Sequence, residues 1–284
     1  MSGSTSTRGR KGSPRGRPSS VELFADPELS GRFLDHYETL RGKVRREIVR
    51  RHLQDVVLDS AGKPLRVVDV GCGDGLDAIW LASQGHDVIG VDPSPAMVER
   101  AEENLEQVAE DLTITFSEGD LSSVLAREGE ATFDLVLSHG VIMYQEEPRS
   151  FVAEHLRLVK DMGVLSLLAK NTAGFVYRAA KEASADEAMQ ALDDACGLGH
   201  LGVSTGGQSI QELATYGHIA GATVRSWAGV RIFSDSPTDV LVEEDDAKVI
   251  ELEWLAARRD PYRQTAALLH VLQLKGLDLG LLPA

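Results

Sequence analysis

Short apolar runs alternate with segments of helical periodicity over most of the chain. The runs that we interpret as strands are VVDV at 67–70, His86–Val91, Leu112–Ser117, FDLVLSH at 133–139 and GVLSLLAK at 163–170. The segments between them that have apolar residues at helical spacing lie near Asp77–Gln84, Pro95–Val108 and Arg149–Val159. This alternation predicts an α/β fold in which helices wrap a parallel sheet.

The flanking regions follow the pattern less regularly. Two helices are predicted before the first strand, over Asp26–Tyr37 and Glu38–Leu58, and the second is basic from Arg41 to Arg51. After a helix that ends near Ala183, an acidic and glycine-containing stretch runs through Gly207, and we interpret it as an insertion after the fifth strand. The elements predicted beyond it are a helix at Ser209–Ala220, a strand at Thr223–Ser234, a helix at Asp245–Arg259 and a last strand at Ala267–Lys275.

Length and charge favour one acidic domain with a basic tail. The 284 residues are 43% hydrophobic and carry a net charge of −15, which argues against a protein held to nucleic acid mainly by its electric field. Residues 1–20 contain five bases and no acid, and they are too polar to form a core. We expect a disordered tail over 1–20, as a solvated leader or an RNA-contacting arm, and one domain over 21–284.

The composition gives no sign of a membrane, a disulfide framework or a metal. The N-terminal segment lacks the apolar core of a signal peptide, and no stretch approaches 18 uninterrupted apolar residues, so we expect a cytoplasmic protein. The two cysteines, Cys72 and Cys196, have no metal-ligand spacing. We interpret Cys72 as a small buried side chain.

The segment VVDVGCGDG at 67–75 predicts a small-molecule site at the end of the first strand. Its glycines allow the backbone to approach a ligand closely. A dinucleotide fingerprint would need glycine where Leu76 stands, and Asp69 and Asp74 would repel a pyrophosphate. No Gly-Lys-Ser/Thr of a P-loop follows. S-adenosylmethionine fits instead, because it has no phosphate and carries a sulfonium and an α-amino group.

Two later strands also end in carboxylates. Asp92 lies about 20 residues after the glycines, where the ribose diol would bind, and Asp120 is placed to accept from the adenine amino group. Each acid by itself is more often a turn or helix-cap residue than a ligand. Together with Asp69 at strand–helix spacing, they favour a cofactor cradle.

With these motifs in place, the chain resembles the class I S-adenosylmethionine-dependent methyltransferases. It resembles in particular the bacterial tRNA 5-carboxymethoxyuridine (carboxyl) methyltransferase group, which methylates a carboxylate on a wobble uridine. The segments that carry this resemblance are YETLRGKVRREIVRRHLQDVV, FDLVLSHGVIMYQEEPRSFVAEHLRLVKDMGVLSLLAKNTAGFVYRAA, GVRIF and ELEWLAARRDPYRQTAALLHV. The resemblance implies a Rossmann-like, doubly wound sheet of seven strands with the last strand antiparallel. It also implies cofactor contacts from Arg45, Gly71, Cys72, Gly73, Asp92, the Leu121–Ser122 turn and His139.

Two departures from this group leave the acceptor open. Where the group has a lysine-rich stretch, this chain has no base from Glu182 to Tyr216 except His200. Met143 and Tyr144 stand where the group tends to have an acid and a tryptophan. The acceptor is therefore tRNA or a small carboxylic acid of specialised metabolism, and a cofactor-binding partner protein without catalysis is a further alternative.

The chemistry of a carboxylate acceptor singles out two candidate catalytic residues. An ionised carboxylate needs no general base but needs a cationic clamp, and Arg231 could hold it bidentately. His139 could pack on the cofactor, or act as a base toward a hydroxyl or amine. A surface arginine and a capped histidine are equally compatible with the sequence. Further pocket candidates are Tyr37, Asn171, Tyr177 and Tyr262.

Overall fold

The computed structural model describes residues 39–109, 111–194, 196–198, 204–235, 241 and 244–276. The predicted basic tail, the predicted helix at Asp26–Tyr37 and the candidate Tyr37 lie outside these residues.

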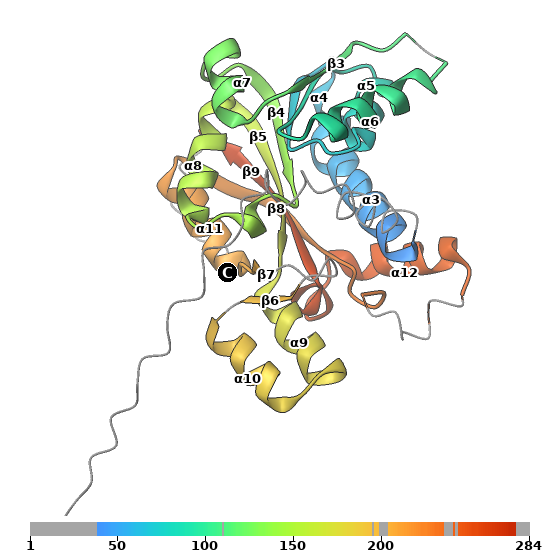
Figure 1. Ribbon diagram of the computed structural model, residues 1–284, viewed down its shortest axis with the longest axis vertical. Coiled ribbons are helices and arrows are strands. Elements are labelled where there is room, and N and C mark those ends of the chain that lie inside the picture. The colour runs from blue at the N-terminus through green and yellow to red at the C-terminus, as the bar shows by residue number, and fades with distance from the viewer. Residues whose placement is uncertain are drawn as a thin grey trace, which may run out of the picture.

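A seven-stranded sheet forms the centre of the molecule (Figure 1). Its strands are β1 Arg66–Val70, β2 Asp87–Asp92, β3 Ile114–Glu118, β4 Phe133–His139, β5 Val159–Lys170, β8 Ala222–Val230 and β9 Leu268–Lys275. Their order is β3-β2-β1-β4-β5-β9-β8, and β9 runs antiparallel to both of its neighbours while the other pairs are parallel. The predicted Rossmann-like sheet with an antiparallel last strand is confirmed.

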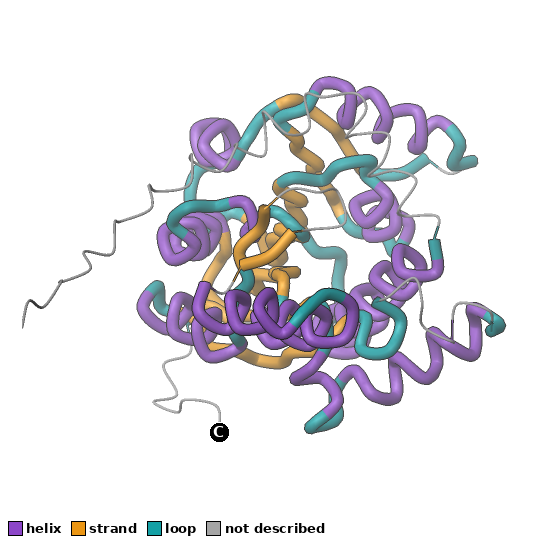
Figure 2. Tube along the Cα trace, turned by 60° about the horizontal axis from the view of Figure 1, so that its bottom comes forward, coloured by secondary structure: helices purple, strands orange, loops and turns teal. Residues whose placement is uncertain are grey.

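Helices cover both faces of this sheet (Figures 1 and 2). On one side lie α3 Leu40–Leu53, α5 Leu76–Ser83, α6 Pro95–Glu106 and α12 Asp246–Ala257. On the other side lie α7 Leu121–Glu128, α8 Pro148–Leu158 and α11 Ile210–Ile219. The central strands are buried on both faces, which explains why β1, β4 and β5 read as continuous apolar runs.

The basic helix before the first strand is less uniform than predicted. Thr39 caps α3, with its hydroxyl accepting from the Gly42 amide at 3.3 Å. The predicted helix Glu38–Leu58 continues beyond Leu53 as a five-residue π-helix, Gln54–Leu58, and a single turn α4, Asp59–Ala61. The buried face of α3 packs on the sheet. Its polar residue Arg45 lies beside the glycine loop, at the carboxyl ends of the strands.

An insertion follows the fifth strand, as predicted. It contains α9 Thr172–Glu182, α10 Ala185–Asp194 and the antiparallel pair β6 Cys196–Leu198 and β7 Ser204–Gly206. The insertion begins directly at the carboxyl end of β5 and projects beyond the sheet (Figure 1). None of the helices in the described part of the chain is long and apolar enough to span a membrane.

Candidate cofactor and acceptor site

The glycine loop turns the chain sharply from β1 into α5. Gly71 and Gly75 have φ angles of 80° and 73°, in the left-handed region that favours glycine. A Cβ at Gly71 would approach Val141 Cγ2 to 2.6 Å, and one at Gly75 would lie 2.7 Å from the side chains of Ala101 and Phe116. Larger residues would therefore push the loop out of its place at the end of the strand.

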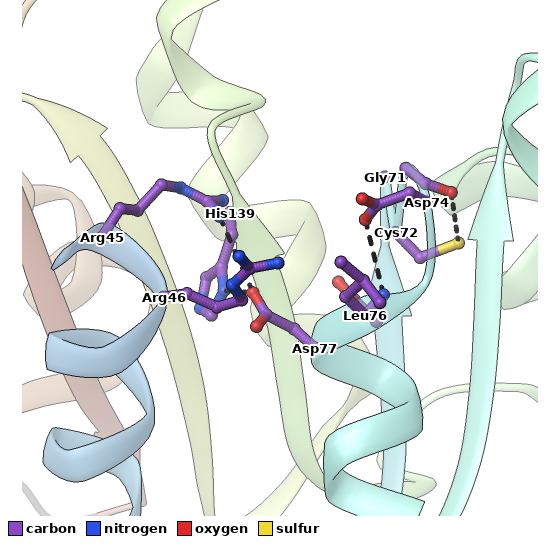
Figure 3. A pocket seen from close by; sticks show the side chains of 10 residues that line it. Arg45, Arg46, Gly71, Cys72, Asp74, Leu76, Asp77 and His139 are labelled. Carbon is purple, nitrogen blue, oxygen red and sulfur yellow. Dashed lines mark hydrogen bonds and ion pairs between the residues drawn. The ribbon is translucent and has the colours of Figure 1, made fainter. Parts of the chain in front are cut away.

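A cavity that is partly open to solvent lies beside this loop (Figure 3). The cavity is lined by the predicted cofactor residues Arg45, Asp69, Gly71, Cys72, Gly73 and His139, and by Arg46, Asp74, Leu76 and Asp77, which were not predicted as cofactor residues. The structure thus gathers six of the predicted residues around one cavity.

Asp69 provides a test of whether this cavity suits a cation. Its side chain is buried, and its Oδ1 has no hydrogen-bond partner among the described residues. Burial, reinforced by the negative charges of Asp77, Asp92 and Asp74 and opposed by Arg45, raises the pKa of Asp69 to about 8. Burial likewise raises the pKa of Asp74. An ammonium or sulfonium group in the cavity would pair the unsatisfied carboxylate, so the site fits S-adenosylmethionine.

Asp92 holds the glycine loop from the neighbouring strand. Its Oδ2 accepts from the Gly73 amide and its Oδ1 from the Ser94 amide, both at 2.9 Å. Burial nevertheless raises the pKa of Asp92. The side chain does not line the cavity described above, and its predicted contact with a ribose stays a prediction.

The third predicted acid acts as a helix cap in the structure. Asp120 Oδ1 accepts from the Ser123 amide at 2.9 Å and from the Ser122 hydroxyl at 3.0 Å. Leu121 and Ser122 form the first turn of α7, and their predicted contact with the cofactor stays a prediction. The capping box between Asp120 and Ser123 explains the helix start.

Asp77 is the centre of the charged wall of the cavity (Figure 3). Its carboxylate lies 3.3 Å from Arg50 Nε, 3.6 Å from His139 Nδ1 and 3.9 Å from Arg45 Nη1. Burial alone would raise the pKa of Asp77, but His139 and the two arginines outweigh it and hold the pKa well below its usual value. Asp77 is therefore ionised at neutral pH, whereas burial lowers the pKa of His139 and keeps its ring neutral.

Arg231 is buried, which overturns the alternative of a surface arginine. Only 5% of the residue is exposed, and its Nε lies 3.2 Å from Asp235 Oδ1. Its φ angle of 59° ends β8 at Val230, so the predicted strand Thr223–Ser234 is four residues too long. A non-glycine residue in this region is uncommon and points to a constrained position.

Glu253 of α12 supports the loop after Arg231. Its two carboxylate oxygens accept from the backbone amides of Ile232, Phe233 and Ser234 at 2.8–3.0 Å and from the Ser234 hydroxyl at 2.6 Å. Burial raises the pKa of Glu253, and these four bonds oppose the shift. The loop that carries Arg231 and Asp235 is therefore built around one buried carboxylate.

Lys170, the last residue of β5, is a second cation next to Arg231 that the sequence analysis missed. Its Nζ donates to Thr205 Oγ1 at 2.8 Å and lies 5.3 Å from the centre of the Phe175 ring. Burial, together with the charges of Arg231 and Arg178, lowers the pKa of Lys170 to about 7. Two basic side chains thus share a partly desolvated space at the carboxyl ends of β5 and β8, and Lys170 is only about half protonated at pH 7.

Helix α3 joins this cationic cluster to the cofactor cavity. Arg41 Nη1 donates to the Asp235 carbonyl at 3.1 Å, while Arg45, one turn later, lines the cavity. Burial lowers the pKa of Arg231, and the charges of Arg41 and Arg45 contribute to the shift. The cationic cluster and the cofactor cavity are therefore close enough for their charges to interact.

The other pocket candidates have structural or peripheral positions. Asn171 caps α9, and its amide donates to the carbonyls of Gln264 and Ala266 at 2.9 and 2.8 Å. Tyr177 and Tyr262 are 54% and 50% exposed. Among the described residues, no group of three or more His, Cys, Asp or Glu side chains is arranged to hold a metal ion.

Comparison with known proteins agrees with this geometry. Residues 68–167 match the family model described as a methyltransferase domain. The chain contains this domain and is an S-adenosylmethionine-dependent methyltransferase. It is 28% identical to the tRNA 5-carboxymethoxyuridine methyltransferase of Escherichia coli O157:H7 over 240 residues, which cover 83% of this chain and 89% of the relative. It is also 34% identical to a ubiquinone biosynthesis O-methyltransferase of Roseobacter denitrificans, over 43% of this chain and 49% of that protein.

Solved structures share the fold. Magnesium protoporphyrin IX methyltransferase from Synechocystis PCC 6803 with bound S-adenosylhomocysteine superposes with a TM-score of 0.61 at 17% identity, over 89% of this chain and 97% of that chain. The plantazolicin methyltransferase in complex with an analogue and S-adenosylhomocysteine gives a TM-score of 0.58 at 15% identity, over 90% and 93% of the two chains. At these identities the likeness concerns the fold.

Proposed function

We propose that this methyltransferase forms a methyl ester on a carboxylate acceptor. The observation that carries the proposal is the buried Arg231, with the half-buried Lys170 close enough to feel its charge, near the cofactor cavity of an otherwise acidic protein. Two basic groups close together repel each other and are costly to desolvate. An acceptor carboxylate bound beside them would lower this cost and could be oriented by both side chains.

The cofactor is assigned to the cavity beside the glycine loop. When bound, S-adenosylmethionine supplies an electrophilic methyl group on a positively charged sulfur. Asp69 would pair with its α-ammonium group, and the backbone of Gly71, Cys72 and Gly73 would approach it closely. The remaining predicted contacts are Asp92 to the ribose, Asp120, Leu121 and Ser122 near the adenine, and Arg45 and His139 along the wall.

The acceptor would be held and aligned rather than deprotonated. A carboxylate is ionised at neutral pH, so a lone pair is already available for in-line attack opposite the sulfur. Arg231, fixed by Asp235 and by the loop around Glu253, would orient it, with Lys170 adding a second contact. Neutral His139 would line the site and would not accept a proton during the reaction.

A carboxymethoxy group on tRNA is the first candidate acceptor. Two relatives from Escherichia coli, 27–28% identical over 83% of this chain, are named tRNA 5-carboxymethoxyuridine methyltransferases, and the matched region includes the cationic cluster. The cytoplasmic location stays a prediction that agrees with such an acceptor.

A small carboxylic acid is the second candidate, favoured by the way α3 uses its bases. Lys43 pairs with Asp246 at 2.7 Å, and Arg51 pairs with Glu47 and Glu251 at 2.8 and 2.9 Å. These bases are partly neutralised by acids within the protein. The segment 182–216 supplies no lysine or arginine to replace them.

Exchange of Arg231 for lysine tests the proposal. The change Arg231→Lys replaces a bidentate fork by a point charge, so the KM for the acceptor should rise and kcat should fall, while the affinity for S-adenosylmethionine stays nearly constant. Arg225→Lys, on the exposed edge of the same strand, is the matched control. Equal kinetics in the two variants would remove Arg231 from the acceptor site.

Salt dependence separates the two acceptors. With tRNA, activity should fall steeply as salt rises, because phosphate contacts are lost. With a small acid, only the clamp is screened, and the dependence should be shallow.

A further inference from the structure

A continuous chain of buried side chains leads away from the cofactor cavity, and the function proposed above uses only its first residue, His139. It begins at His139, whose Nε2 lies 2.8 Å from Ser166 Oγ. Ser166 Oγ lies 2.8 Å from His270 Nε2, and His270 Nδ1 lies 2.9 Å from His52 Nδ1. The chain ends where His52 Nε2 lies 2.8 Å from Ser226 Oγ.

Five structural elements meet in this chain. His139, Ser166, His270 and Ser226 lie on β4, β5, β9 and β8, which are successive strands of the sheet, and His52 comes from α3. The side chains of Ser166, His270 and His52 are completely buried, and Ser226 is half-buried. Such a network is favourable only when every donor meets an acceptor, so its proton positions are restricted.

The charged groups that face the chain stand at its two ends. Asp77 of α5 and Arg45 of α3 lie at the cavity end, and Arg258, which follows α12, acts on His52. Burial lowers the pKa of His52 to about 3, that of His270 well below its usual value, and that of His139. All three rings are therefore neutral near pH 7, and each carries one N–H.

Two proton arrangements satisfy all four hydrogen bonds and also use every donor of the chain. A third, in which Ser166 accepts from both His139 and His270, leaves its own buried hydroxyl proton without an acceptor in the chain. In the first, every donor points toward the cavity: the N–H groups are His139 Nδ1, His270 Nε2 and His52 Nδ1. In the second, every donor points away from it, and the protons lie on the opposite ring nitrogens. Asp77 is ionised and lies 3.6 Å from His139 Nδ1, so its negative charge favours an N–H at that atom and selects the first arrangement.

We propose that Ser166, His270 and His52 act as positioning residues that fix His139 as the neutral tautomer with its proton on Nδ1. The hydroxyl of Ser166 donates into Nε2 and thereby opposes protonation of the ring. The cavity wall then consists of a neutral imidazole and an ionised Asp77, which suits a cationic cofactor. The proposal rests on the position of the cofactor cavity and is independent of the acceptor.

Nitrogen-15 NMR of the histidines in the purified, ligand-free protein tests this arrangement. The expected pattern at about pH 7.5 is a pyrrole-type nitrogen at Nδ1 of His139, Nε2 of His270 and Nδ1 of His52, with all three rings neutral. The opposite pattern, mixed tautomers or a charged ring at this pH would overturn the proposal. No turnover is needed, so failure of the proposed function leaves this result interpretable.

Two variants test whether the tautomers are coupled. Asp77→Asn replaces the anchoring charge by an amide that can donate to His139 Nδ1, so the protons on His270 and His52 should move to the opposite nitrogens. Asp74→Asn, also on the cavity wall, is the matched control and should leave the pattern unchanged. Unaltered His270 and His52 signals in folded Asp77→Asn would contradict a coupled chain.

Substitutions of Ser166 test the effect of interrupting the chain. Ser166→Ala should uncouple His139 from His270 and raise the pKa of His139, so that its signals titrate at higher pH than in the wild type. Ser166→Thr retains the hydroxyl and should restore the native pattern. Ser138→Ala removes a neighbouring, fully buried hydroxyl that has no hydrogen-bond partner among the described residues, and it should change nothing. Equal effects of the two alanine variants would reduce the role of Ser166 to packing.

Discussion

Cofactor binding should release a proton from Asp69. Its pKa is about 8 in the ligand-free protein, because the carboxyl group is buried and surrounded by other acids. At pH 7, one unit below this value, about 0.9 of the Asp69 carboxyl groups carry a proton. A bound cation favours the ionised form, so each S-adenosylmethionine should displace about 0.9 proton at pH 7.

The sign of the pH dependence follows from the same linkage. Because the free protein holds the proton more tightly than the complex, affinity should rise with pH, by up to about tenfold per unit, and level off above about pH 8. Titration calorimetry in buffers of different ionisation enthalpy measures the proton release directly.

Asp69→Asn should bind the cofactor more weakly and abolish the release, whereas Asp161→Asn, at an exposed position, should leave both unchanged. A binding enthalpy that is independent of the buffer in the wild type would refute the assignment of Asp69 as the partner of the cation.

Two further substitutions test residues that hold the loops of the site in place. Asp92→Ala should weaken S-adenosylmethionine binding by about 1–3 kcal/mol in calorimetry, through lost hydrogen bonds to a charged acceptor; unchanged affinity with an intact fold would remove Asp92 from the site. Glu253→Gln should lower the free energy of unfolding by about 1–3 kcal/mol, because buried amides of the Arg231 loop lose acceptors, and should raise the acceptor KM. Glu251→Gln, in an exposed ion pair on the same helix, should have little effect on either, and the account fails if the two glutamine variants behave alike.

The sheet and the cofactor loop could be predicted because their signals are local. Continuous apolar runs that end in glycine or aspartate identify β1 and β2, and the spacing of their acids places them at one edge of the sheet. The antiparallel direction of β9 followed only from family resemblance, since a fully buried strand has the same apolar pattern in either direction.

The missed features depend on contacts between distant segments. Asp77 reads as an ordinary residue of the first helical turn, and only the approach of α3 turns it into the centre of a charged cluster. Lys170 reads as the end of a strand, and its environment comes from the insertion and from Arg231. The strand before Arg231 was predicted too long because the amides that end it are taken up by Glu253, about 20 residues later.

The histidine chain could not be predicted from the sequence for the same reason. His52 and His270 lie 218 residues apart in sequence, and neither belongs to a motif. Their pairing requires α3 to cross the sheet over the antiparallel strand, which no local pattern specifies.

Alkali lability of the transferred methyl group tests the central claim most directly. The purified protein would be incubated with methyl-labelled S-adenosylmethionine and either tRNA containing 5-carboxymethoxyuridine or a low-molecular-mass cell extract. A methyl ester releases labelled methanol in mild alkali, whereas methyl groups on nitrogen, carbon or an ether oxygen stay attached. We predict that the label enters an acceptor, is released by alkali and is strongly reduced with Arg231→Lys. Label that remains bound after alkali treatment would contradict a carboxylate acceptor.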